Sequence, residues 1–311
     1  MNPLHGLKER LFRCCPTLEM RENEPMSRHT SFRIGGPVSL MALPKTEEET
    51  AAALDAAAQQ GVTPLVMGNG SNLLAPDERL SAFVIKCLDG LGQITPLGEG
   101  TIRFGSGLLL ARAALYARDH SLTGLEFAHG IPGSVGGGVM MNAGAYFGEM
   151  SQVVRSVRYL TFSGEHRELS GEALGFSYRK SVFESEAGLI LSADVVLAPG
   201  EKDKISERIF DLARRRKERQ PLEFPSAGSA FKRPGEGQFA AALIDGCGLK
   251  GLRVGDAQVS EKHAGFVINR GQATCKDVME LMEQVHRRVL DETGVALKPE
   301  VKLLGGTTWN F

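Results

Sequence analysis

The stretch of the chain best suited to hold a charged ligand is the glycine-rich segment HGIPGSVGGGVMMNAGAYFG, residues 129–148. Seven of its twenty residues are glycine. Glycine loses much conformational entropy on folding and buries no side chain, so a folded domain concentrates it where the backbone follows an unusual path. Small residues also leave peptide N–H groups uncovered, and concave runs of such groups bind anions. A tight loop between strands is the alternative interpretation.

A second stretch of the same character, GNGSN at residues 68–72, follows an apolar run. Two such loops together favour a large cofactor that carries phosphate groups. Neither loop matches a standard nucleotide fingerprint. Gly68 and Gly70 are followed by Leu73 where the dinucleotide-binding motif requires a third glycine, and no GK[ST] triplet of a P-loop follows either stretch.

Composition excludes several other functions. The chain has 36 basic and 37 acidic side chains, so its net charge of −1 provides no overall field for a nucleic acid or an anionic membrane. The five cysteines include no CxxC pair, and the seven histidines show no HExxH or HxH spacing. We therefore expect a reduced, cytoplasmic protein with neither a disulfide framework nor a bound metal. No apolar run approaches the roughly 18 residues of a membrane span, and the charged N-terminus does not resemble a signal peptide.

The elements around the shorter glycine stretch are expected to be of β-α-β type. Thr46 is expected to cap a helix, with Glu49 as its capping-box partner and Gly61 at its end. Strands are expected at residues 64–67, directly before GNGSN, and at residues 83–87.

The middle of the chain is expected to be mainly antiparallel sheet. A strand at 101–107 and an amphipathic helix over 108–122 precede the longer glycine stretch. After it, alternating apolar and polar residues predict a strand at 152–162, which an SGEH turn makes part of a hairpin. A further strand is expected at 188–199.

From residue 201 the composition indicates a domain boundary. A charged helix over 201–220 ends at Pro221, and its basic run 214–219 is more typical of a solvated helix face than of a phosphate contact. A short helix near 241–248, a strand at 264–271, a long helix from Thr274 to Gly294 and a strand-like VKLLG segment then predict a third block, of α+β type.

Six blocks of the sequence occur in the order found in the UDP-N-acetylenolpyruvoylglucosamine reductases. They are GNGSNLL, GIPGSVGG with NAGAYFGEM, SYRKSVF, AGSAFKRP, GLKGLRVGDAQVSEKHAGFVIN and PEVKLLG. No block is specific alone, but six in order, from about residue 29 to residue 304, make the chain resemble this family over nearly its whole length. The short segment between Phe183 and Ser192 resembles the family branch that lacks an inserted tyrosine loop.

The resemblance implies an α+β fold with a two-lobed FAD-binding region of the vanillyl-alcohol-oxidase (PCMH) type and a C-terminal α+β lobe for the substrate. The expected domains are an N-terminal extension over 1–28, which we expect to be unstructured, FAD-binding lobes over 29–95 and 96–200, and the substrate-binding lobe over 201–311.

The resemblance also implies an enzyme that completes UDP-N-acetylmuramate in a cytoplasmic step of bacterial peptidoglycan synthesis. Noncovalent FAD would pass a hydride from NADPH to the β carbon of an enolpyruvyl ether, so the side chains position reactants, stabilise charge and supply a proton. Both glycine stretches are expected at the cofactor pyrophosphate. The cofactor-binding residues so implied are Gly68, Asn69, Gly70, Ser71, Asn72, Leu73, Gly130, Ile131, Pro132, Gly133, Ser134, Gly136, Gly137, Asn142, Ala143 and Gly144.

Hydride addition leaves a carbanion beside a carboxylate, which needs a cation or hydrogen-bond donor and an acid. In the resemblance, Arg179 of SYRKS meets the developing charge, Ser229 of AGSAF gives its proton to the α carbon, and Glu300 of KPEVK is paired with the arginine. Without the family, plainer interpretations would be preferred: a structural arginine, a turn-forming serine and a solvent-facing carboxylate.

The resemblance places Tyr178 and Lys217 in contact with the sugar-nucleotide substrate. At Arg233 the chain departs from members that carry Asn, which leaves the contact made there open. The sequence also leaves open the oligomeric state, the basis of the NADPH preference, domain motion on substrate binding, and any role of Cys14 and Cys15.

Two other functions remain open at this point. A flavin-dependent oxidase of the same superfamily would need no Ser229–Glu300 pair, and His129 is the candidate for a covalent flavin link in such an enzyme. A flavin- or UDP-sugar-binding protein without catalytic activity is the second alternative.

Overall fold

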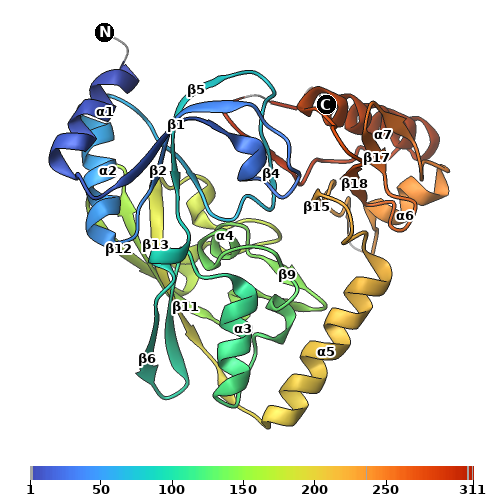
Figure 1. The fold of residues 1–311 in the computed structure, drawn as a ribbon. Coiled ribbons are helices and arrows are strands. Elements are labelled where there is room, and N and C mark those ends of the chain that lie inside the picture. Colours follow the sequence, from blue (N-terminus) through green and yellow to red (C-terminus); the bar gives the residue numbers. More distant parts are fainter. Residues whose placement is uncertain (1–2, 236, 307, 310) are drawn as a thin grey trace. The chain divides into compact units, whose positions relative to one another are not determined.

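In the computed structural model, which describes residues 3–235, 237–306, 308, 309 and 311, the chain forms two units. Figure 1 shows the elements in chain order. The first unit contains the residues up to Arg21, Leu40–Asn69 and Phe83–Arg216; the second contains Glu22–Ser39, Gly70–Ala82 and Lys217–Phe311. Each unit is therefore built from segments that lie far apart in the sequence.

Regular secondary structure begins closer to the N-terminus than expected. Helix α1 (Pro3–Cys14) and strand β1 (Glu19–Pro25) occupy the segment expected to be unstructured, and that expectation is wrong for the residues from Pro3 on. Leu7 and Leu11 are fully buried and belong to one core with apolar residues of α2 (Glu47–Gln59). Two leucines one turn apart form a narrow apolar stripe, which is inconspicuous among the charged neighbours.

A β-α-β segment follows, as expected. Strand β2 (Pro37–Leu43) precedes α2, and β3 (Leu65–Met67) then pairs in parallel with β5 (Leu80–Lys86) in a four-stranded sheet of order β1-β2-β5-β3. Thr46 caps α2 by accepting a bond of 3.1 Å from the Glu49 N–H. The Glu49 carboxylate accepts from the N–H of Lys45 at 2.7 Å. In the expected capping box it would accept from the N–H of Thr46, one residue later.

The middle block forms the expected antiparallel sheet, of order β12-β11-β13-β7-β6. Its strands are β6 (Ile94–Gly98), β7 (Thr101–Gly105), β11 (Val154–Thr161), β12 (His166–Ser170) and β13 (Gly188–Val196). β11 and β12 form the predicted hairpin. The short pairs β8 (Leu122–Thr123) with β14 (Ala198–Pro199) and β9 (Gly144–Ala145) with β10 (Gly148–Glu149) accompany the sheet.

Two helices pack in this block. Helix α3 (Leu110–Asp119) is the one expected from the sequence. Helix α4 (Val135–Met140) lies inside the longer glycine stretch, which the sequence analysis treats as a loop, and it contacts β13 and β7 of the sheet. Burial of Val135 and Val139 against this core stabilises a helix that its three glycines disfavour.

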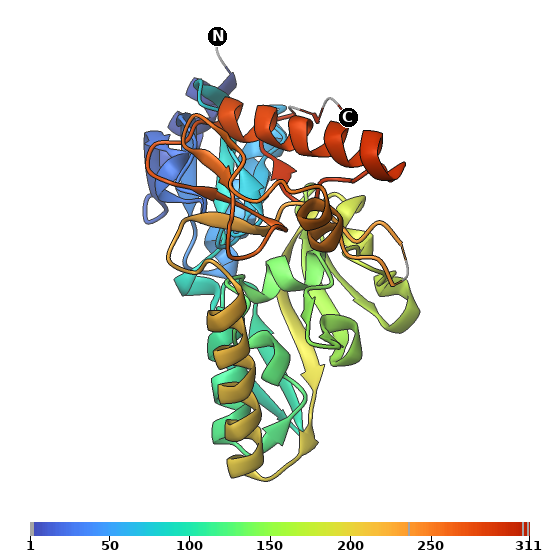
Figure 2. The same cartoon turned by 90° about the vertical axis from the view of Figure 1, so that its right-hand side faces the viewer.

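The second unit contains a four-stranded antiparallel sheet of order β15-β18-β17-β16. The strands are β15 (Ser226–Ser229), β16 (Arg253–Val254), β17 (Ala257–Val259) and β18 (Phe266–Asn269). Figure 2 shows α7 (Cys275–Thr293) across one face of this sheet, with α6 (Ala240–Gly246) beside it. A last pair joins β4 (Leu73–Leu74) in parallel to β19 (Lys302–Leu303).

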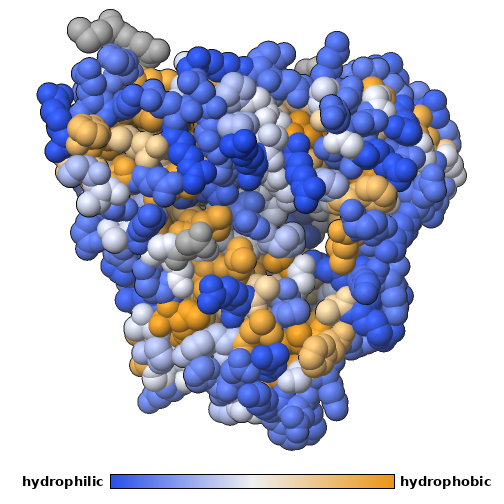
Figure 3. Space-filling model, viewed as in Figure 1, coloured by the Kyte–Doolittle hydropathy of each residue, from blue (hydrophilic) through white to orange (hydrophobic). Residues whose placement is uncertain are grey.

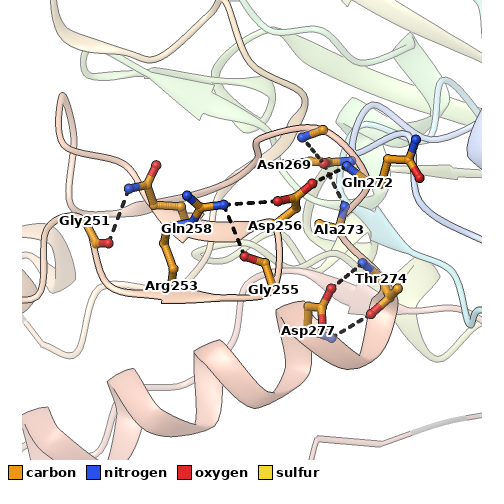
Figure 4. A network of polar contacts seen from close by, with 11 residues as sticks. Gly251, Arg253, Gly255, Asp256, Gln258, Asn269, Gln272, Ala273, Thr274 and Asp277 are labelled. Carbon is orange, nitrogen blue, oxygen red and sulfur yellow. Dashed lines mark hydrogen bonds and ion pairs between the residues drawn. The ribbon is translucent and has the colours of Figure 1, made fainter.

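The start of α7 is fixed by the polar network drawn in Figure 4. Thr274 and Asp277 form a reciprocal capping box, with bonds of 3.0 and 2.9 Å. Asp256, in the β16–β17 turn, accepts bonds from Arg253 and from the Gln272 N–H. Asn269, at the end of β18, accepts the Ala273 N–H at 3.0 Å. The turn, the strand and the helix are thus joined by bonds, and the helix ends at Gly294 as expected, with φ +73°.

The buried apolar residues form three cores: one around α1, α2 and β5, one around the five-stranded sheet, and one around α6 and α7. The boundary between the two units nevertheless falls inside α5 (Lys202–Arg219), between Arg216 and Lys217, and not at residue 201. The assignment of three functional lobes stays a prediction. No helix in the described part of the chain is long and apolar enough to cross a membrane.

Candidate cofactor and substrate site

The two glycine-rich loops meet within the first unit. The side-chain amide of Asn69 donates to the carbonyl oxygen of Pro132 at 2.6 Å. A Cβ atom at Gly68 would overlap the hydroxyl of Ser134, so only glycine permits this approach. The structure therefore brings together the start of GNGSN and the start of the longer stretch, residues that the resemblance assigns to the same cofactor.

Helix α4 has one glycine for which the protein's own packing gives no reason. A Cβ at Gly136 would lie 3.0 Å from Ser106, and one at Gly138 would lie 3.1 Å from Leu110, so both glycines serve internal contacts. Gly137 is exposed, and a Cβ there would meet only the Ser134 hydroxyl, at an ordinary 3.7 Å. Because glycine costs a helix about 1 kcal/mol relative to alanine, a ligand that approaches the backbone here would account for it.

A buried hydroxyl lies beside this helix. Ser106 Oγ has no hydrogen-bond partner among the described residues, although it is out of reach of water. An unpaired buried polar group is costly and marks a place where a partner is missing. Gly68 and Gly137 leave backbone uncovered, and Ser106 offers an unpaired hydroxyl. These features together fit a cofactor that carries phosphate groups.

Large apolar side chains are exposed in or near the longer glycine stretch. Figure 3 shows apolar side chains, in orange, at the surface among the polar ones. In the first unit, Leu109, Phe147 and Tyr178 are exposed large apolar residues, and Phe147 is completely exposed. Phe147 lies in the longer glycine stretch, and Leu109 directly precedes Leu110, whose N–H donates to the carbonyl of Gly133 at 3.0 Å. Leu109 and Phe147 thus expose apolar side chains in or next to the stretch that the resemblance assigns to the cofactor.

The loop that carries Arg179 lies against the end of the same glycine stretch. Arg179 Nη1 donates to the carbonyl oxygen of Gly144 at 3.3 Å, and the Asn142 amide donates to the carbonyl of Ser177 at 3.1 Å. The guanidinium of Arg179 lies 5.4 Å from the ring centroid of Tyr178. Asn142 and Arg179 have φ of +40° and +56°, a left-handed conformation that is unfavourable outside glycine and concentrates at functional sites.

Ser229 and Glu300 come together within the second unit. The N–H of Glu300 donates to the carbonyl oxygen of Ala230, the residue after Ser229, at 2.8 Å. A bridge between Phe231 and Pro299 continues this pairing. Glu300 is only 9% exposed, so the plain interpretation of a solvent-facing carboxylate is wrong.

The second half of GNGSNLL is hydrogen-bonded to the Glu300 segment. The Asn72 side-chain amide donates to the Glu300 carbonyl at 3.1 Å, and the Asn72 carbonyl accepts the Lys302 N–H at 3.0 Å. Gly70 has φ +66°, and its carbonyl accepts the Ser31 N–H at 3.1 Å. The Ser31 hydroxyl in turn donates to the Ser226 carbonyl at 2.6 Å. Ser31, which the sequence analysis does not single out, thus links the GNGSN loop to the strand of Ser229.

The remaining predicted residues are placed as follows. Ile131, Ala143 and Gly144 are half-buried in the first unit, whereas Ser71 and Leu73 are half-buried in the second. Lys217 is exposed, and its carbonyl accepts a bond of 2.8 Å from Lys262 Nζ. Arg233 is exposed too, with its guanidinium 5.0 Å from the ring centroid of Phe239. The substrate role of both basic residues stays a prediction.

One basic residue on α5 lies against the longer glycine stretch without having been expected there. Ile205, Ile209 and Leu212 form the buried stripe of this helix, and Arg216 is the next position on it. Arg216 is half-buried and donates from Nη1 to the carbonyl oxygen of Gly130. The interpretation of run 214–219 as a solvated face is therefore wrong for Arg216, and the i, i+4 spacing from Leu212 is the signal that would have found it.

Comparison with known proteins gives matches along most of the chain. Residues 38–170 match the model of an FAD binding domain. Residues 220–304 match the C-terminal domain of UDP-N-acetylenolpyruvoylglucosamine reductase.

Whole proteins of the same name match as well. The reductase of Lachnoclostridium phytofermentans is 47% identical over 91% of this chain and 92% of its own length, and that of Clostridium novyi is 44% identical over 94% of each. The crystal structure of the enzyme from Thermus caldophilus is 36% identical, superposes with a TM-score of 0.77, and is covered over 98% of its chain.

Proposed function

This chain belongs to the UDP-N-acetylenolpyruvoylglucosamine reductase family, and we propose that it reduces UDP-N-acetylglucosamine enolpyruvate to UDP-N-acetylmuramate with NADPH in the cytoplasm. It is an FAD-containing oxidoreductase of peptidoglycan synthesis. The observation that carries the proposal is the pairing of the Ser229 segment with buried Glu300. The alternatives, an oxidase and a non-catalytic binding protein, give no role to that pairing.

We expect FAD to be bound noncovalently where the two glycine-rich loops meet and where polar groups lack a partner in the protein. Asn69 and Pro132 join the two loops, Gly137 leaves the α4 backbone bare, and Ser106 has an unused hydroxyl. When bound, FAD supplies hydride transfer between the reduced nicotinamide and the enolpyruvyl β carbon. The side chains then have to manage only charge and one proton.

Ser229 is assigned the proton. Once the β carbon has gained a hydride, the α carbon carries an electron pair conjugated with the carboxylate. The Ser229 hydroxyl gives its proton to that α carbon, which completes the lactyl ether of the product. Serine is a weak acid, but a carbanion is basic enough to take its proton.

Arg179 and Glu300 are assigned to the charge that appears during this step. The planar guanidinium of Arg179 suits the carboxylate of the substrate, on which the negative charge grows. Its bond to the Gly144 carbonyl ties the Arg179 loop to the longer glycine stretch. Glu300 acts on the same charge from a buried position, with its backbone fixed on both sides by Ala230 and Asn72.

An anaerobic titration tests the proposed function. The yellow protein should be bleached by NADPH under argon and recoloured by the enolpyruvyl nucleotide, because the substrate accepts the electrons. An oxidase would recolour only when oxygen is admitted. A binding protein without activity would stay yellow or would not recover its colour with the nucleotide, and either result would refute the proposal.

A further inference from the structure

The segment 305–311, which follows the residues that match the family's C-terminal domain, folds back onto the segment of Glu300. Gly305 and Gly306 have φ of +86° and +83°, a left-handed conformation that glycine adopts readily. A Cβ atom at Gly305 would also overlap the side chain of Leu80 in β5. The two glycines therefore allow the backbone to turn back at this point. The described residues of the segment are called the tail below.

Trp309 of the tail is attached to the residue that follows Glu300. Its indole Nε1 donates to the carbonyl oxygen of Val301 at 3.0 Å. Val301 is buried, and the half-buried ring of Trp309 packs against the core around α6 and α7. The ring and the N–H of Trp309 thus fix the tail directly beside Glu300.

Phe311 of the tail packs on the segment that follows Ser229. Its ring centroid lies 6.4 Å from that of Phe231, which is buried. Phe231 is two residues after Ser229, and it forms the backbone bridge to Pro299. The ring of Phe311 is therefore supported by the same residue that joins the Ser229 segment to the residues before Glu300.

Phe311 also packs on a helix residue that holds the approach to Glu300. Its ring centroid lies 4.6 Å from that of His286 on α7. His286 Nδ1 donates to the carbonyl oxygen of Leu297 at 2.9 Å, three residues before Glu300. The tail thus reaches the backbone on both sides of Glu300, and all of these contacts lie within the second unit.

The pairing between the two catalytic segments has few other supports. It lies outside the strands of the sheet and consists of one bridge with a backbone bond on each side: the N–H of Lys232 donates to Lys298, and that of Glu300 donates to Ala230, both at 2.8 Å. A short two-stranded pairing is only marginally stable by itself. Aromatic rings packed against it supply the missing stabilisation.

We propose that the tail positions Glu300 against Ser229 for the protonation step, with Trp309 and Phe311 as positioning residues. The proposal rests on the proposed function, because it gives the tail a part in that reaction. Neither ring is assigned a contact with substrate or cofactor. Each acts through the backbone beside Glu300, and a displacement of a reacting group by about 1 Å can cost on the order of 10²-fold in rate.

Amide hydrogen exchange of the FAD-saturated, full-length protein tests the positioning without any substrate. In Phe311→Ala the amides of Lys232 and Glu300 should exchange about 10-fold faster or more, because the pairing opens more often. The matched control is Val254→Ala, which removes a half-buried side chain from the same core at the opposite edge of the sheet. It should leave both amides as protected as in the wild type. Unchanged protection in Phe311→Ala would overturn the proposal, whatever the enzyme catalyses.

Stopped-flow absorbance tests the consequence for the reaction, at a temperature where every variant is folded. With saturating enolpyruvyl nucleotide, Phe311→Ala should slow reoxidation about 10- to 100-fold and leave reduction by NADPH unchanged. Trp309→Phe keeps a ring and loses only the N–H donor, so its defect should be in the same step and smaller. Phe311→Leu should recover most of the rate, because it fills much of the space. Val254→Ala should resemble the wild type in both steps. Equal slowing of both steps in Phe311→Ala would show a merely structural tail and overturn the proposal.

A double variant tests whether the tail acts through Glu300. If it does, Phe311→Ala combined with Glu300→Gln should reoxidise within about twofold of Glu300→Gln alone. Effects that multiply in full would show an independent action and overturn the proposal. The wild type in the same experiment reports on the proposed function: failure of the nucleotide to reoxidise it would refute that function, and the exchange measurement would still decide whether the tail holds Glu300.

Discussion

The backbone N–H of Glu300 donates to the carbonyl oxygen of Ala230 at a distance of 2.8 Å. This bond places side by side two segments that are 70 residues apart in the sequence. Ala230 follows Ser229 directly, so this bond ties the assigned proton donor to the assigned carboxylate. Asn72 holds the other side of Glu300 by donating to its carbonyl oxygen at 3.1 Å. Three segments far apart in the sequence are therefore hydrogen-bonded to one another within the second unit.

The assigned roles of Glu300 and Arg179 predict a defect in only one half-reaction. Glu300→Gln and Arg179→Ala should slow reoxidation of the reduced enzyme by the enolpyruvyl nucleotide, on the order of 10²–10³-fold, and change reduction by NADPH little. The charge that they stabilise develops only on the substrate. Stopped-flow absorbance at the flavin band measures both steps. Glu207→Gln, an exposed carboxylate on α5, is the control and should change neither. Equal slowing of both steps in either variant would argue against the assigned roles.

Gly137 tests whether the bare backbone of α4 is a cofactor contact. Gly137→Val meets no crowded protein neighbour, so the fold should persist, while FAD affinity should fall ~10–100-fold because the side chain fills space that the cofactor needs. Gly70 is a poorer test, since its φ of +66° would strain any substitution. Gly246→Val in α6, which also has open space around it, is the matched control. Full retention of FAD by Gly137→Val would place the cofactor elsewhere.

The N-terminal helix should contribute to the stability of the first unit. Leu7→Ala and Leu11→Ala each remove a fully buried side chain and should each lower the free energy of unfolding by about 2–5 kcal/mol. Phe12→Ala, on the exposed side of the same helix with 69% of its surface accessible, should change it by roughly 0.5 kcal/mol or less. Denaturant unfolding of the FAD-saturated protein measures both values. Equal effects of Leu11→Ala and Phe12→Ala would mean that α1 does not pack as described.

Stability should decrease when the solution is acidified through the titration range of two half-buried histidines, His263 and His129. Burial lowers the pKa of His263, whose Nδ1 accepts the Gly265 N–H at 3.1 Å, and burial also lowers that of His129. The unfolded state, with a usual pKa of about 6.5, then binds more protons than the folded state. The stability that the neutral histidines contribute is complete above the unfolded-state pKa. It is lost as the pH falls from there through the lowered pKa values of the folded state. His263→Gln should flatten the urea-unfolding free energy measured across this range. The exposed His166→Gln should retain the wild-type slope, and an identical slope in all three proteins would contradict the prediction.

The parts of the fold that the sequence predicts are those with local signals. Thr274 and Asp277 at one end of α7 and Gly294 at the other define that helix within a few residues of chain. The hairpin of β11 and β12 likewise follows from alternation and a turn. Helix α4 could not be predicted, because Gly136, Gly137 and Gly138 disfavour a helix and only packing against the sheet stabilises it.

In the candidate site, too, the residues could be predicted from the sequence and their arrangement could not. The residues themselves came from the order of the motifs, whereas their arrangement depends on contacts across long stretches of sequence. The pairing of Ala230 with Glu300, and the link from Asn72 to both, have no local signature. Arg216 could not be singled out by residue type, because the other five residues of the run 214–219 are charged as well. Only its spacing of four residues from the buried Leu212 places it on the inward face of α5.

The most direct test of the account is rapid-mixing absorbance of Ser229→Ala under argon. Reduction by NADPH needs no proton at the substrate carbon, so its rate should remain close to the wild-type rate. Reoxidation by the enolpyruvyl nucleotide should slow by about 10⁴-fold, the upper end for a general acid, because a carbanion without its proton donor returns the hydride. Ser206→Ala, on α5, should behave as the wild type in both steps. Reoxidation of Ser229→Ala at the wild-type rate would remove Ser229 from the mechanism and contradict the central assignment.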